Sequence, residues 1–91
     1  MGNVMAILDV IQENILGCQS VAFDEHAIRR MYERNVTLDE VLDVLRNPTQ
    51  TGLPAHPNRF RYRKHSSPQN WVDVVFEHDP TQIVVFTVLR K

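Results

Sequence analysis

The chain has 91 residues, of which 43% are hydrophobic, and its formal net charge is −1. This length supports one domain over residues 1–91, and the apolar fraction excludes a disordered chain. No segment has the roughly 18 apolar residues that cross a membrane. The N-terminal segment carries Asp9 and Glu13 and lacks a basic start, so we expect no signal peptide. The single cysteine, Cys18, excludes an internal disulfide, so we expect a cytoplasmic protein that does not bind membranes.

The N-terminal segment has the apolar spacing of an amphipathic helix over residues 4–16. Gly17 follows at the position where a helix commonly ends. We therefore predict an N-terminal helical extension over residues 1–17, and a homodimer formed through this helix.

Two further helices are predicted, over residues 24–34 and 38–46. Asp24 suits the N-cap of the first, and Asn35 suits the left-handed residue that ends it. In the second, Thr37 and Glu40 have the spacing of a capping box.

The residues after the helices predict an antiparallel sheet. Alternating or continuous apolar runs predict strands over residues 59–65, 71–78 and 82–89, and the last is apolar on both faces, as in a well-covered strand. Short connections between consecutive strands favour an antiparallel meander. The predicted fold class is α+β, with N-terminal helices packed on a three- to four-stranded antiparallel sheet.

One face of the 24–34 helix has the residue types of an anion or acid–base site. At helical spacing His26, Arg30 and Glu33 share a polar stripe with Arg34 beside it, while Ile28, Met31 and Tyr32 form the opposite, core-facing side. The alternative is an ordinary solvated face with an ion pair to Glu33.

The 59–65 strand has arginines on alternate positions. They project from one face about 7 Å apart, which suits a phosphodiester backbone. In the register expected for the following turn, Arg63 faces Asp73 and Arg59 faces Glu77, so these pairs can equally be cross-strand salt bridges. Arg61 then faces a valine and is expected to have no acidic partner.

Charge is divided unevenly along the chain, −4 over residues 1–47 and +3 over residues 48–91. Four basic residues of the second half lie between Arg59 and Lys64, and this basic patch can hold phosphates. The alternative is that the two halves pair through salt bridges. No histidine or cysteine spacing is typical of a metal site, and no phosphate loop or nucleophile elbow is present. We therefore expect no cofactor and no metal.

The chain also resembles a bacterial domain-of-unknown-function family, number four-two-five-eight in the DUF series. The resemblance covers residues 21–91 and rests on linked pieces in the family's order: Phe23 to Thr37, Leu38 to Pro48, Arg59-Phe60-Arg61-Tyr62 and Ile83 to Leu89. It implies a fold similar to RelE-like toxins and colicin-type tRNA nucleases, and functional positions at His26, Arg30, Arg34 and Arg61.

Two functions follow as expectations. In the first, a metal-independent endoribonuclease of the bacterial toxin kind cleaves RNA through its 2′-hydroxyl. His26 serves as base or acid because imidazole exchanges a proton near neutral pH; Arg30 and Arg61 bind the phosphate, Arg34 supports them, and Glu33 is a second acid–base candidate. The alternative is a non-catalytic protein-interaction or nucleic-acid-binding module of a toxin–antitoxin-like pair. The expected partners are RNA or an antitoxin-like protein.

Overall fold

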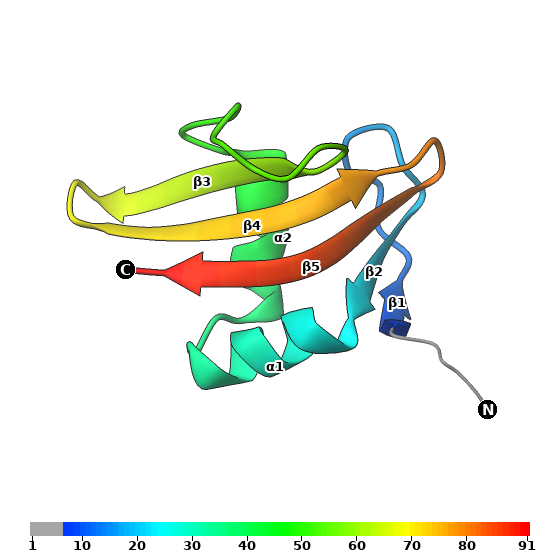
Figure 1. The fold of residues 1–91 in the computed structure, drawn as a ribbon, viewed down its shortest axis with the longest axis horizontal. Coiled ribbons are helices and arrows are strands. Elements are labelled where there is room, and N and C mark those ends of the chain that lie inside the picture. The colour runs from blue at the N-terminus through cyan, green and yellow to red at the C-terminus, as the bar shows by residue number, and fades with distance from the viewer. Residues whose placement is uncertain (1–6) are drawn as a thin grey trace.

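The computed structural model describes residues 7–91. The α+β class is confirmed, with two helices and a five-stranded mixed sheet (Figure 1). In chain order the elements are β1 (Ile7–Ile11), β2 (Ser20–Asp24), α1 (Glu25–Glu33), α2 (Leu38–Arg46), β3 (Phe60–Ser67), β4 (Asn70–His78) and β5 (Gln82–Arg90).

The sheet has the strand order β1-β2-β5-β4-β3. Strands β2 and β5 are parallel, and the other neighbouring pairs are antiparallel. The central place of β5 explains why its sequence is apolar on both faces. The predicted β3–β4 register is confirmed, since Arg63 pairs with Asp73 and Arg61 with Val75.

The predicted N-terminal helix over residues 4–16 is wrong. Residues 7–11 form strand β1, and a tight turn at Leu16 and Gly17 leads into β2; residues 4–6 lie outside the described part. The apolar residues of 7–11 satisfy strand and helix patterns alike, and pairing with the buried strand β2 decides between them. The antiparallel sheet of three to four strands is corrected to a mixed sheet of five, and the expected homodimer loses the helix that was to form it.

Both later helices begin at their predicted caps. The Asp24 carboxylate accepts a hydrogen bond from the His26 amide at 2.7 Å, and Asn35 has a φ of 55° just after α1. At α2 the Thr37 hydroxyl accepts from the Glu40 amide at 3.1 Å, and the Glu40 carboxylate accepts from the Thr37 amide at 2.9 Å. These bonds satisfy amides that have no partner inside the helix.

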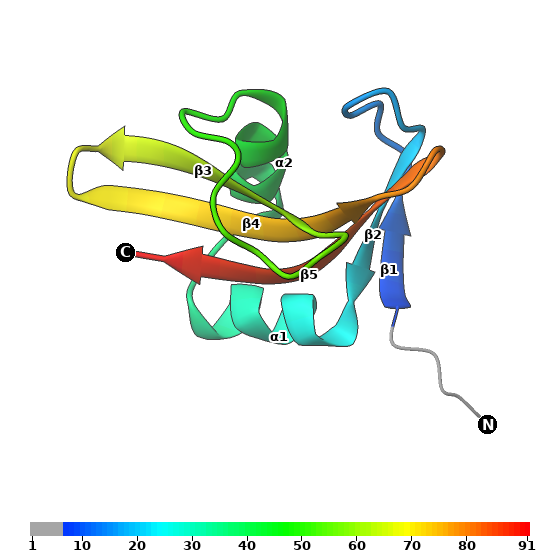
Figure 2. The ribbon, with the colours of Figure 1, turned by 45° about the horizontal axis from the view of Figure 1, so that its top comes forward.

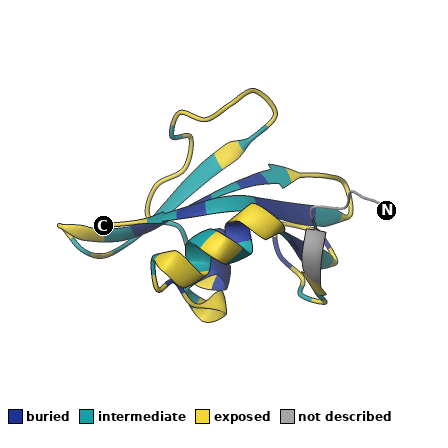
Figure 3. Ribbon diagram, turned by 60° about the horizontal axis from the view of Figure 1, so that its bottom comes forward, coloured by how far each residue is buried: buried dark blue, intermediate teal, exposed yellow. Residues whose placement is uncertain are grey.

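The core lies between the helices and one face of the sheet. Helix α2 packs across β3 and β4, and Leu42, Leu45, Val74 and Phe76 belong to one buried cluster. Figure 3 shows buried stretches of the sheet beside the helices. Phe60 is 46% exposed on edge strand β3, and its ring stacks on Phe76.

Helix α1 runs beside β5 beyond the point where β2 ends (Figures 1 and 2). Along this stretch β5 has no neighbouring strand on that side among the described residues, and the Arg34 guanidinium donates to the Val88 carbonyl at 2.6 Å. Only a narrow stripe of so short a helix is covered at the sheet margin. Tyr32, expected to face the core, is therefore 92% exposed.

Candidate functional site

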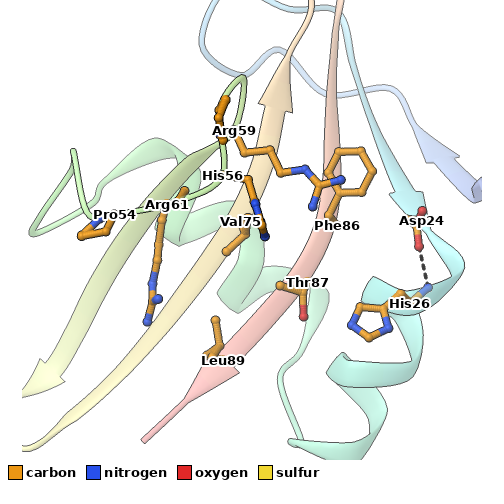
Figure 4. A pocket seen from close by; sticks show the side chains of 12 residues that line it. Asp24, His26, Pro54, His56, Arg59, Arg61, Val75, Phe86, Thr87 and Leu89 are labelled. Carbon is orange, nitrogen blue, oxygen red and sulfur yellow. Dashed lines mark hydrogen bonds between the residues drawn. The ribbon is translucent and has the colours of Figure 1, made fainter.

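The sheet face opposite the core carries a hollow of about 880 Å³. The segment between α2 and β3 crosses over this face and forms one wall (Figure 2). The start of α1 forms the other wall, and β3, β4 and β5 form the floor (Figure 4). The lining residues are Asp24, His26, Pro54, Ala55, His56, Pro57, Arg59, Arg61, Val75, Phe86, Thr87 and Leu89.

The α1 wall contributes His26, which is exposed in the first helical turn. The Arg30 Nε donates to the His26 Nε2 at 3.3 Å, and the Arg30 Nη1 donates to the Glu33 carboxylate at 2.7 Å. These contacts join residues three and four apart on one helix face, as the polar stripe predicted. Arg30 thus contacts His26 from outside the hollow and does not line it.

The β3 side of the hollow is built on a buried carboxylate, Asp73, whose side chain is completely buried. It accepts from the Arg61 Nε at 2.6 Å, and from the Arg63 Nε at 2.7 Å and Nη2 at 3.0 Å. The hydrogen-bonded carboxylate raises the pKa of Arg63. Two guanidinium groups share one carboxylate, so the cluster keeps one positive charge.

The expectation that Arg61 has no acidic partner is wrong. Val75 lies directly opposite Arg61 in the register, but the long side chain reaches Asp73, the diagonal neighbour on the same face. Asp73 engages the Nε atom of Arg61. The two terminal nitrogens of Arg61 make no hydrogen bond to any described residue, so they are free to bind an anion at the hollow.

The other two strand arginines are held by the protein itself. The Arg59 guanidinium lies 3.9 Å from the centre of the Phe86 ring, and its Nε is 3.6 Å from the Glu77 carboxylate. The Arg63 guanidinium lies 3.9 Å from the centre of the Trp71 ring. The salt-bridge alternative raised by the sequence therefore describes Arg59 and Arg63 well.

The remaining predicted residues lie away from the floor. Arg34 binds the Val88 carbonyl at the margin of β5, and Glu33 forms an ion pair with Arg30. The structure thus brings His26 and Arg61 to one hollow and sets Arg30 against His26. Their catalytic roles stay predictions.

Sequence reasoning missed two polar lining residues, His56 and Thr87. His56 lies between α2 and β3, and its position on the wall depends on the path of this loop. Thr87 had a signal, since it is the one polar residue within the 83–89 run. A β-bulge at Phe86 shifts the pairing between β4 and β5, so Phe86 and Thr87 both line the hollow.

No group of three or more histidine, cysteine, aspartate or glutamate side chains within residues 7–91 is arranged to hold a metal ion. Neither α1 nor α2 has the length and apolar character needed to cross a bilayer.

The family comparison covers the elements that build this hollow. A family model described as a domain of unknown function (DUF4258) matches residues 23–90, which run from the end of β2 to the end of β5. No curated protein and no solved structure gives a significant match to the chain. The likeness to RelE-like toxins therefore stays a prediction. Because the family model matches most of the chain, the chain belongs to the DUF4258 family.

Proposed function

We propose that the protein is a metal-independent endoribonuclease. The observation that supports this most is the meeting of an imidazole, His26, and an anchored guanidinium with free terminal nitrogens, Arg61, at one open hollow. Cleavage of RNA by its own 2′-hydroxyl needs a base, a proton donor and positive charge beside the phosphorus.

The proposed reaction assigns one role to each group. His26 removes the proton from the 2′-hydroxyl, whose oxygen then attacks the phosphorus. The bond to the 5′-oxygen breaks, and this oxygen takes a proton from His56 on the opposite wall. The products are a 2′,3′-cyclic phosphate and a 5′-hydroxyl. Arg61 stabilises the charge on the non-bridging oxygens. Arg30 turns from the His26 Nε2 to the phosphate when RNA binds, which frees this nitrogen to accept the proton.

The test is cleavage of an end-labelled RNA in EDTA. His26→Ala should lower the rate by about a hundredfold or more. Arg61→Ala should also lower it about a hundredfold or more, as expected for the loss of a group that stabilises the transition-state charge. His78→Ala is the matched control, because His78 is exposed on β4 outside the hollow, and it should leave the rate unchanged. Equal rates for His26→Ala and the wild type would contradict the proposal.

A second candidate, a protein-interaction module, is favoured by a separate apolar groove of about 560 Å³ beside α1 and the start of α2. Tyr32 lines this groove and is 92% exposed, which is unusual for a large aromatic side chain. The groove and the hollow share no lining residue. Tyr32→Asp should therefore abolish binding of an antitoxin-like protein while leaving RNA cleavage intact.

A further inference from the structure

The floor of the hollow is apolar where a phosphate-only site would be polar. Val75, Phe86 and Leu89 form much of it, and Pro54 and Pro57 stand on the wall above. Sugars and phosphates gain little from such a surface, whereas the flat faces of a nucleobase are buried well against it. The volume of about 880 Å³ lies in the range of small-molecule sites and exceeds the needs of a single base.

Arg59 adds a planar surface to this floor. Its guanidinium is stacked on the Phe86 ring and is held near Glu77, so its plane is fixed before any ligand arrives. The Arg59 side chain is still 33% exposed and lines the hollow. A fixed guanidinium plane is a stacking surface for an unpaired base.

Thr87 supplies one polar group in the apolar floor (Figure 4). Its hydroxyl makes no side-chain hydrogen bond to any other residue of the described chain. A hydroxyl both donates and accepts, so it can bind the edge of a base that lies on the floor. The bulge at Phe86 is what gives Thr87 this position, because it brings two successive residues of β5 to the same side.

Resting on the proposed ribonuclease function, we infer that the hollow binds an unpaired nucleobase, so that the substrate class is single-stranded RNA. The base lies on the floor beside Thr87, with Arg59 as its stacking partner. The neighbouring phosphate lies at the rim beside Arg61, whose terminal nitrogens make no hydrogen bond to any described residue. A base inside a duplex has its faces covered by neighbours and its edge paired, so it cannot occupy this floor without leaving the helix.

The test compares one RNA sequence as a single strand and as a perfect duplex, each assayed for cleavage in EDTA and for binding by fluorescence anisotropy. Binding uses strands with 2′-O-methyl groups, which cannot be cleaved through the 2′-oxygen. We expect the single strand to be cleaved and bound at least tenfold better. Arg59→Ala should weaken single-strand binding about fivefold to a hundredfold, the range for loss of one stacking surface.

Thr87 variants test how the base is recognised. Across single strands that differ in one base, Thr87→Val should reduce the spread of kcat/KM values at least fivefold, and Thr87→Ser, which keeps the hydroxyl, should restore it. Thr81→Val in the exposed turn before β5 is the matched control and should change nothing. Urea unfolding midpoints establish that the variants are folded; if Thr87→Val is not, the comparison of Thr87→Ser with Thr87→Ala replaces it.

The possible failures are distinguishable. Equal cleavage of single strand and duplex would overturn the base-binding inference and leave the ribonuclease proposal standing. Absence of cleavage together with single-strand binding that is weakened by Arg59→Ala would overturn the ribonuclease proposal and support the base site. Binding that is equal for both forms and insensitive to Arg59 and Thr87 would overturn the inference whatever the cleavage result.

Discussion

Asp73 is the residue whose replacement should have the broadest effect. Its carboxylate is completely buried and accepts three hydrogen bonds from two guanidinium groups. Asp73→Asn removes the negative charge, turns one oxygen into a donor that faces other donors, and leaves Arg61 and Arg63 to repel each other. Removing one partner of a buried ion pair costs about 3–5 kcal/mol. The arginine side chains are 27% and 19% exposed and recover some solvation, so we expect about 3 kcal/mol.

Urea unfolding measures this cost, and Glu77→Gln is the matched control. Glu77 lies on the same strand and also pairs with an arginine, but its side chain is 35% exposed and its carboxylate lies 3.6 Å from the Arg59 Nε. Its replacement should cost less than about 1 kcal/mol. If the proposed ribonuclease function holds, Asp73→Asn should also slow RNA cleavage in buffer without urea, at a pH where the variant is folded, because Arg61 loses its anchor. A free energy of unfolding within the error of the Glu77→Gln value would refute this account of the cluster.

Three further predictions concern α2 and its contacts. Leu42→Ala should lower the free energy of unfolding by about 2–5 kcal/mol, measured by urea denaturation, because Leu42 is only 7% exposed in the core; an unchanged midpoint would contradict its place there. Thr37→Ala should cost about 1 kcal/mol in the same assay through loss of the cap, and Thr37→Ser, which keeps the hydroxyl, should recover most of it. The hydrogen bond from Arg90, helped by the bonds at Thr37, lowers the pKa of Glu40 below its ordinary 4.5. The unfolded chain then binds the proton first as the pH falls, so this stabilisation is present above about pH 4.5 and is lost below it; Glu40→Gln should flatten the stability change between about pH 6 and pH 3, and an identical pH profile would contradict the linkage.

Local signals predicted the parts of the fold that depend on neighbouring residues. The capping box at Thr37 and the register that pairs Arg63 with Asp73 follow from short spacings, and both are confirmed. The two N-terminal strands depend on one pairing between distant parts of the chain. Strand β1 pairs with β2, and β2 pairs with β5, but a run such as Val21 to Phe23 does not indicate which strand it will pair with.

The parts of the candidate site that depend on a single element could also be predicted, and the others could not. The helical stripe with His26 and the alternation that exposes Arg61 are properties of single elements, and the sequence predicted them. The ion pair to Asp73 needed a diagonal contact, and the place of Thr87 needed a bulge that strict alternation does not contain. The wall that carries His56 depends on the path of a loop across the sheet.

Because β2 pairs in parallel with β5, the site can form only after β5 has been synthesised. Ser20 and Gln82 are paired across a separation of 62 residues, and closing so long a segment is slow compared with forming a hairpin. The floor residues Phe86, Thr87 and Leu89 all belong to β5, which is synthesised after the other four described strands. A growing chain can therefore form its helices and the β3–β4 hairpin while it still has no hollow. Premature termination before residue 82 yields a polypeptide without the middle of its sheet, so truncated products lack the floor of the hollow.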